Sequence, residues 1–110
     1  AGWYTQYLPS SVIKPTIHQK AKSVFHLYVI QCQDRENLQK HLATQGIGCL
    51  IHYPIPPHLQ KAYESLGYSK GDFPIAEKLA QTVLSLPLFI GMTEIQVKNV
   101  CAEIEKFYNA

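Results

Sequence analysis

The chain has 110 residues, 46% of them hydrophobic, which is enough for one globular domain with a core of its own. Ten basic residues against eight acidic ones give a formal net charge of +2, and these residues are scattered, so no basic face for nucleic acid or an anionic membrane is predicted. The three cysteines form no C-x-x-C pair, no apolar run approaches the ~18–20 residues of a membrane-spanning helix, and no segment resembles a signal peptide. Together these features predict free thiols in a soluble, cytoplasmic protein.

The first residues predict a short helix. Apolar and aromatic residues recur there at helical spacing, namely Trp3, Tyr4, Tyr7 and Leu8. Neither a capping residue nor an initiating Met stands in front of them. We therefore expect residues 1–10 to be the tail of a longer linking helix and residues 11–110 to be a C-terminal small domain. A short native arm that packs on its own domain is the alternative.

A strand, a helix and a second strand are predicted next. Residues 24–32 are dense in β-branched and aromatic residues, with apolar side chains on both faces, which is typical of a strand. Asp34 is in position to cap a helix that ends at Gln45, before Gly46. Residues 48–53 predict the second strand.

Two helices follow in the sequence. Residues 57–66 begin with a proline and carry apolar residues at i, i+3, i+4 and i+7, and Gly67 closes this predicted helix. Residues 75–83 form another apolar stripe at helical spacing.

The end of the chain completes the predicted fold. Residues 84–87 predict a brief strand, and Thr93 and Gln96 form a capping box in front of a last helix over 94–107. The order of elements predicts an α+β domain with a small, mainly antiparallel, three-stranded sheet and helices packed on one face. The other face of the sheet is apolar enough to need a partner.

The most distinctive segment is the loop after the second predicted strand. His52 and His58 bracket it, and its three prolines fix φ near −65° and remove backbone donors, so the loop is rigid. A rigid loop at the end of a strand is a good place for imidazole and phenol groups to meet a ligand. The spacing of the two histidines is not that of a zinc site, and no metal site is predicted.

The other candidate residues are interpreted as structural. This applies to His18, His26 and His41, and to Ser85, which has no evident base beside it in the sequence. The sequence contains no Walker A, dinucleotide-binding or G-x-S-x-G motif.

Five ordered segments are specific enough to be compared with known families. They are Asp34-Arg35, Gly46-Ile47-Gly48, His52-Tyr53-Pro54-Ile55-Pro56-Pro57-His58-Leu59-Gln60, Gly71-Asp72-Phe73-Pro74-Ile75-Ala76-Glu77 and Leu84-Ser85-Leu86-Pro87. With these segments in this order, the chain closely resembles the C-terminal domain of the DegT/DnrJ family of PLP-dependent nucleotide-sugar aminotransferases. The resemblance covers residues 3–108.

The resemblance implies a fold-type I aminotransferase that is longer than this chain and normally a homodimer. In that family a lysine of the large N-terminal domain holds pyridoxal phosphate (PLP) as a Schiff base, and that domain supplies most of the other cofactor contacts. We therefore assign no catalytic residue here and expect Lys61 to be solvated. The chain alone is expected to bind no cofactor and to be inactive, and to pack on its own large domain in the parent protein.

The scarcity of arginine favours a sugar substrate independently. Amino-acid aminotransferases typically clamp the substrate α-carboxylate with a small-domain arginine, whose planar fork matches a carboxylate. The one arginine of this chain, Arg35, is expected to point outward from the first turn of its helix. A site without this clamp fits an enzyme whose main substrate is a keto sugar.

Within the family, the His-Tyr-Pro-x-Pro-x-His-Leu-Gln form resembles the branch that aminates C3 of 3-keto-6-deoxy sugars on a dTDP carrier. Such reactions belong to deoxysugar biosynthesis, for example of lipopolysaccharide or O-antigen, and amination at C4 remains open. Glutamate or glutamine would be the amino donor. The implied substrate-binding residues are His52, Tyr53, His58 and Gln60. We expect the two histidines and Tyr53 to share one exposed edge, with His52 facing the ligand.

An alternative from another class is a stand-alone α+β module that binds a ligand or regulates another protein without catalytic activity. A parent gene with a long upstream region that encodes a Schiff-base lysine would favour the enzyme instead. So would an exposed apolar sheet face where a large domain is expected to pack.

Overall fold

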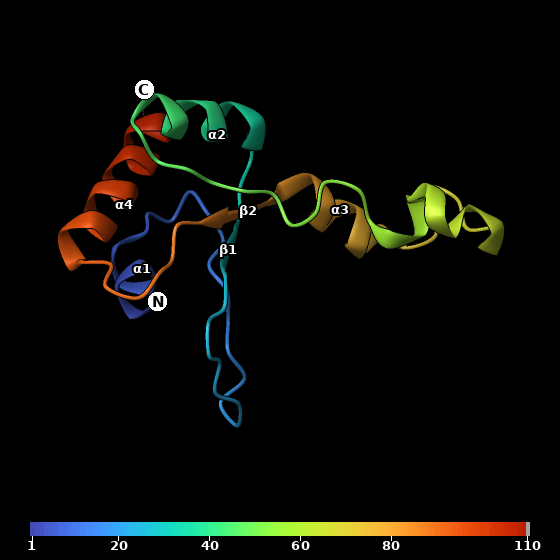
Figure 1. Cartoon of the computed structure of the whole chain (residues 1–110), viewed down its shortest axis with the longest axis horizontal. Helices are drawn as coiled ribbons and strands as arrows, with labels where there is room; N and C mark the ends of the chain where they lie inside the picture. The colour runs from blue at the N-terminus through green and yellow to red at the C-terminus, as the bar shows by residue number, and fades with distance from the viewer. Residues whose placement is uncertain (110) are drawn as a thin grey trace.

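The computed structural model describes residues 1–109 and consists of a body from which two arms project, within extents of 48 × 37 × 23 Å (Figure 1). The body holds α1 (Gly2–Tyr7), β1 (Tyr28–Gln31), α2 (Arg35–Thr44), β2 (Val83–Leu86) and α4 (Glu94–Asn109). The first arm, blue in the figure, comprises residues 14–27. The second arm, green to brown, carries the 3₁₀-helices η1 (Pro57–Leu59) and η2 (Lys61–Leu66) and the helix α3 (Pro74–Thr82).

An antiparallel sheet of two strands joins the body to both arms. Tyr28 of β1 lies opposite Leu86 of β2, and the pairing continues along the four residues of each strand. Beside β2, Leu50 forms a single bridge with Ser85. The α+β class is confirmed, but the predicted three-stranded sheet is not, because residues 48–53 contribute only this bridge. The prolines from position 54 onward have no amide hydrogens with which to extend the pairing.

The first predicted strand is also shorter than expected. Of residues 24–32 only Tyr28–Gln31 are paired, because the partner strand β2 is itself four residues long. Val24 lies in the first arm, where its side chain is 94% exposed. Its β-branched side chain favours an extended backbone, but no neighbouring strand is present there for it to pair with.

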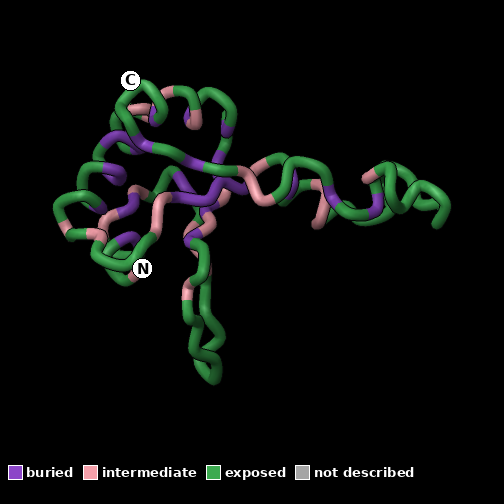
Figure 2. The backbone as a smooth tube through the Cα atoms, in the orientation of Figure 1, coloured by how far each residue is buried: buried purple, intermediate pink, exposed green. Residues whose placement is uncertain are grey.

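The core lies between the sheet and the helices of the body, as the buried stretches in Figure 2 show. Its largest fully buried side chains are Tyr4, Tyr28, Ile30, Leu38, Leu42, Leu84 and Ile104. Every residue of β2 is buried and none of β1 is exposed, contrary to the expected apolar sheet face in need of a partner. Large exposed apolar side chains lie mainly on the arms and loops, such as Ile55 and Ile75, and a few lie on the helices of the body, such as Ile95.

Of the two helix caps predicted from the sequence, one forms as expected and the other does not. The capping box in front of α4 is confirmed: the Gln96 N–H donates to Thr93 Oγ1 over 3.2 Å, and the Thr93 N–H donates to Gln96 Oε1 over 2.8 Å. Asp34 precedes α2 as predicted, but its carboxylate accepts from the Asn37 side-chain amide over 2.9 Å and caps no backbone N–H.

The predicted helix over 57–66 is wrong in type. The segment forms η1 and η2 in place of an α-helix, and no residue of η2 is buried. Its apolar residues have helical spacing, but the arm offers no extended surface against which an apolar stripe could pack. Gly67, at φ 78°, ends the segment as predicted, in a backbone region that favours glycine.

The prediction that Arg35 points outward is wrong. Its side chain is buried, and Nη1 donates to the carbonyl oxygens of Ala80 and Val83. These carbonyls lie at the end of α3 and the beginning of β2, where a cation is favourable for the helix dipole. Arg35 therefore joins the beginning of α2 to the α3–β2 junction.

Among residues 1–109, no helix combines the length and the apolar character that crossing a bilayer requires.

Candidate substrate-binding loop

The loop starts from a fixed point beside the sheet. The Ser85 N–H donates to the Leu50 carbonyl over 2.8 Å, and the Leu50 N–H donates to the Ser85 carbonyl over 3.2 Å. Leu50 lies two residues before His52, so the chain enters the loop with little freedom.

His52 and Tyr53 stand at the beginning of the loop. His52 is half-buried, and its Nδ1 lies 2.8 Å from Ser85 Oγ. Its Nε2 has no hydrogen-bond partner within residues 1–109 and is not fully buried, so this nitrogen keeps some exposure to solvent. Tyr53 is 68% exposed, and the two rings are edge to face, 5.4 Å apart. These two side chains are therefore available to a ligand, and the contact with Ser85 fixes the ring of His52.

Ser85 was not recognised from the sequence as a partner of His52. The sequence predicts a packing residue without a base beside it, but the structure brings an imidazole to its hydroxyl. A signal was present, because Ser85 is a polar residue between Leu84 and Leu86 in a strand whose residues are all buried. A buried hydroxyl normally has a hydrogen-bond partner.

His58 does not share the exposed edge predicted for it. Its side chain is 8% exposed, and Nε2 lies 3.2 Å from the carboxylate of Glu77 on α3. The same carboxylate accepts from the N–H of Gly71 over 2.9 Å and from the N–H of Phe73 over 3.3 Å. The Gly71 N–H is the main cause that lowers the pKa of Glu77, and His58 adds to it. This cluster fixes the far end of the loop to α3.

Gln60 likewise turns toward its own loop, since its side-chain amide donates to the Ile55 carbonyl over 3.0 Å. The four predicted site residues thus form two groups. His52 and Tyr53 lie beside the sheet, whereas His58 and Gln60 hold the second arm together.

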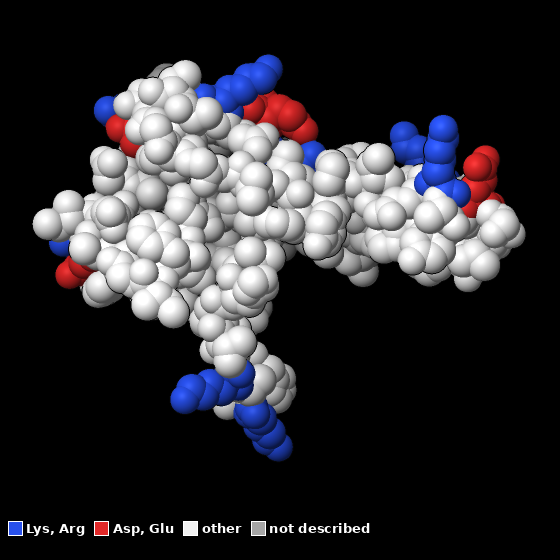
Figure 3. All heavy atoms as spheres, in the orientation of Figure 1, with Lys and Arg blue, Asp and Glu red and all other residues white. Residues whose placement is uncertain are grey.

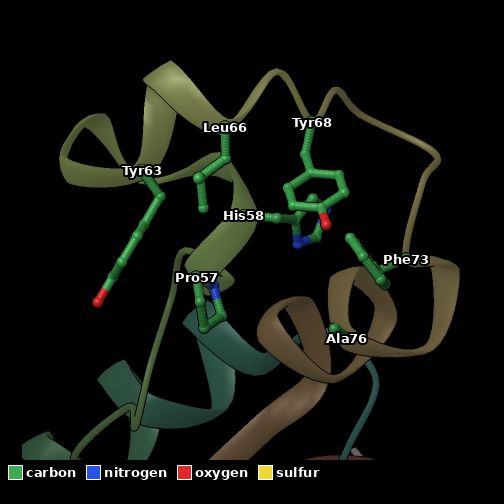
Figure 4. Close-up of a pocket in the computed structure, with 7 residues that line it drawn as sticks. All are labelled: Pro57, His58, Tyr63, Leu66, Tyr68, Phe73 and Ala76. Carbon is green, nitrogen blue, oxygen red and sulfur yellow. The ribbon is translucent and has the colours of Figure 1, made fainter.

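The second arm forms an open pocket of about 400 Å³ next to His58 (Figure 4). Its lining is mostly aromatic and aliphatic: Pro57, His58, Tyr63, Leu66, Tyr68, Phe73 and Ala76. The rings of His58 and Phe73 meet edge to face at 4.8 Å, and those of Tyr68 and Phe73 at 5.0 Å. With its Nε2 bound to Glu77, His58 stiffens this cluster and has little polar surface left for a ligand.

Neither a lysine suited to a Schiff base nor a metal-binding cluster is found among residues 1–109. A lysine that forms a Schiff base needs a desolvated position that lowers its pKa. Lys14 is only half-buried and donates to the Thr5 carbonyl, and every other lysine in the described part of the chain is exposed. These lysines do not fit the role of the PLP lysine. Within residues 1–109 no group of three or more His, Cys, Asp or Glu side chains could hold a metal ion.

Charge gives no further hint of a binding face. Figure 3 shows the charged side chains in small separate groups on the arms and the body, with no continuous basic area on the visible face. Among the other histidines, Nε2 of His41 pairs with Glu103 over 3.2 Å between α2 and α4. This is a structural position.

Comparison with known proteins gives the chain its family. The model of the DegT/DnrJ/EryC1/StrS aminotransferase family matches residues 1–105. The erythromycin biosynthesis sensory transduction protein EryC1 of Saccharopolyspora erythraea is 51% identical over 83% of this chain and 25% of its own length. The dTDP-3-amino-3,6-dideoxy-alpha-D-galactopyranose transaminase of Aneurinibacillus thermoaerophilus is 37% identical over 97% of this chain and 29% of its own length.

A solved structure agrees with these relatives. The crystal structure of DesV from S. venezuelae matches with a TM-score of 0.89 and 30% identity, over 99% of this chain and 31% of that protein. The chain thus spans between a quarter and a third of the length of the proteins it matches. It belongs to the DegT/DnrJ/EryC1/StrS aminotransferase family.

Proposed function

We propose that the full-length protein is a PLP-dependent aminotransferase that moves the amino group of glutamate or glutamine to C3 of a dTDP-linked 3-keto-6-deoxy sugar. Family membership over residues 1–105 supports the aminotransferase activity. The name of the Aneurinibacillus relative supports the dTDP carrier, the 6-deoxy sugar and position C3.

The observation that carries a substrate role for this domain is the position of His52. Its ring is held at Nδ1 by Ser85, while the Nε2 edge is accessible next to the exposed Tyr53. Imidazole and phenol groups bind hydroxyl and phosphoryl oxygens, and a ring fixed in advance loses little entropy when it does so. In this proposal His52 and Tyr53 position the sugar nucleotide for attack at its keto carbon.

His58 and Gln60 support the substrate site indirectly. Both side chains are engaged within the second arm, with Glu77 and with the Ile55 carbonyl. We assign them the role of shaping the loop that presents His52 and Tyr53.

Bound PLP supplies the chemistry of amino-group transfer. Because the lysines described here are solvated or half-buried, the cofactor site is assigned to the large N-terminal domain of the parent protein. The proposal includes packing of this domain on that large domain in a homodimer.

The test uses the full-length protein loaded with its cofactor, a panel of dTDP- and UDP-linked keto sugars, and glutamate or glutamine. Mass spectrometry follows the amino sugar, and NMR locates the new amino group. Amination at C3 of a dTDP sugar is the expected result, whereas amination at C4 would replace the C3 assignment. No product from any keto sugar would favour the alternative of a ligand-binding or regulatory module.

His52→Ala in the full-length enzyme should lower kcat/KM about tenfold or more, which corresponds to ~1.4 kcal/mol of lost transition-state stabilisation. Cofactor absorbance and dimer stability should stay unchanged. Glu105→Ala, at an exposed position of α4, is the control and should leave the kinetics unaltered. Wild-type kinetics or general unfolding of the His52 variant would remove His52 from the substrate site.

A further inference from the structure

The position of Ser85 is fixed on both sides of its strand. It lies opposite Val29 in β1, and on the other side it exchanges two backbone hydrogen bonds with Leu50. Ser85 is 4% exposed. Its hydroxyl therefore points from a rigid, nearly closed position toward the ring of His52.

The hydrogen bond between Ser85 Oγ and His52 Nδ1 can be made in two ways. Either the hydroxyl donates to an unprotonated Nδ1, or a protonated Nδ1 donates to the hydroxyl oxygen. Ser85 Oγ has no other hydrogen-bond partner in the described part of the chain. In the second arrangement the hydroxyl hydrogen is thus left without an acceptor in a buried place, which is unfavourable.

We infer that Ser85 is a positioning residue that donates to Nδ1 and thereby holds neutral His52 in the tautomer with its hydrogen on Nε2. The accessible edge of the ring is then an N–H donor, which selects an acceptor oxygen of the ligand. Tautomers of histidine at functional sites are commonly set by the hydrogen bond at the other ring nitrogen. The ligand part of this inference rests on the proposed function, whereas the tautomer does not.

The tautomer can be measured on this chain without substrate. Long-range ¹H–¹⁵N correlation spectra, recorded at a pH above the usual range of imidazole titration, distinguish the two neutral forms. We expect only the Nε2–H form for His52 in the wild-type chain, and a measurable share of the Nδ1–H form in Ser85→Ala. Ser85→Thr, which keeps the hydroxyl on a β-branched residue suited to a strand, should restore the wild-type form. Ser65→Ala, exposed in η2, should change nothing.

Two results would overturn the tautomer assignment. One is an Nδ1–H form of His52 in the wild-type chain. The other is an unchanged tautomer ratio in a folded Ser85→Ala variant. Thermal unfolding of each variant shows whether it is folded, and the wild-type spectrum decides the first point even if Ser85→Ala does not fold.

The ligand part is tested by binding to the full-length enzyme. The probes are dTDP, which has the nucleotide and its diphosphate but no linked keto sugar, and a dTDP-linked keto sugar. Ser85→Ala should weaken binding of the keto-sugar nucleotide about three- to tenfold, and the same loss with dTDP would place the acceptor oxygen on the nucleotide. A loss confined to the keto-sugar nucleotide would place the acceptor oxygen on the linked keto sugar.

Non-additivity separates positioning from general damage. If Ser85 acts through His52, then Ser85→Ala should cause no further loss in a His52→Ala background. Equal losses in both backgrounds would overturn the positioning role. An Nε2–H tautomer in an enzyme that aminates no keto sugar would contradict the proposed function but leave the tautomer assignment intact.

Discussion

Replacing Arg35 by methionine should destabilise the fold. It should not selectively weaken binding of the amino-acid donor. Arg35 is 5% exposed, and its guanidinium donates from Nη1 to the carbonyl oxygens of Ala80 and Val83. Methionine keeps an unbranched apolar side chain in the same space but removes both hydrogen bonds, together with the 2.9 Å ion pair between Nη2 and the exposed Glu36. The junction between α3 and β2 then loses its connection to the beginning of α2.

The magnitude follows from what is lost and what is relieved. A hydrogen bond to a charged group contributes about 1.5–3 kcal/mol, and the bond to Val83, at 3.4 Å, is long enough to count for little. Against this, the change removes a buried charge whose Nε has no partner within residues 1–109. We expect a net loss of about 2 kcal/mol. With an unfolding entropy of about 2.1 cal/mol/K per residue, this lowers the melting temperature of the 110-residue chain by roughly 9 °C.

Thermal unfolding followed by circular dichroism measures this loss. Lys40→Met is the matched control, since Lys40 is an exposed cation on the same helix, and its effect should stay within about 0.5 kcal/mol. An Arg35→Met variant as stable as the control would refute the reasoning. So would a stable full-length variant with a raised KM for glutamate alone, because this would make Arg35 a carboxylate clamp.

Three further predictions concern the folded state. Because the pKa of Glu77 is lowered, the stability that its carboxylate contributes is present above about pH 4.3 and is lost as the pH falls through the folded pKa. The free energy of unfolding in urea should therefore depend less on pH in that acidic range for Glu77→Gln than for the wild-type chain. Tyr4→Phe removes the 2.6 Å hydrogen bond to the Pro87 carbonyl and should cost about 1 kcal/mol, or roughly 4 °C in the same thermal assay; an unchanged melting temperature would contradict this. Burial raises the pKa of Cys49 to about 12 and that of Cys101 to about 11. Iodoacetamide should therefore modify these thiols at least about tenfold more slowly in the native chain than in urea, and rapid modification of the native chain would disprove this.

The features that sequence predicts well here are those whose partners are close along the chain. Thr93 and Gln96 form their capping box within one helical turn, and Gly67 needs only its own backbone freedom. The family resemblance is also confirmed, because it depends on ordered motifs rather than on contacts. Each of these conclusions follows from residues within one turn or from the order of short motifs along the chain, and none needs a contact between distant segments.

The features that sequence misses depend on contacts between distant segments. Arg35 reaches carbonyls of Ala80 and Val83, 45 and 48 positions away, and nothing near Arg35 signals that it is buried. The 3₁₀-helices arise because residues 57–66 lie in an arm away from the core. Ser85 meets His52 across 33 positions, and only the bridge to the short strand β2 brings the two together.

One continuous segment, residues 74–86, fixes both ends of the candidate loop. Glu77 on α3 holds His58, and Ser85 on β2 holds His52. From Glu77 the helix rises by 1.5 Å per residue to the end of α3, and the chain then extends by about 3.3 Å per residue in β2 as far as Ser85. The two anchors are therefore at most about 17 Å apart, the value reached when the two elements run in line. Six residues of extended chain can span such a distance, since each adds up to about 3.3–3.6 Å. The two histidines are thus close in sequence but are held by different elements, His52 by β2 and His58 by α3, where the His58 side chain is buried. For this reason the substrate role is assigned to His52, and His58 is left to anchor the arm.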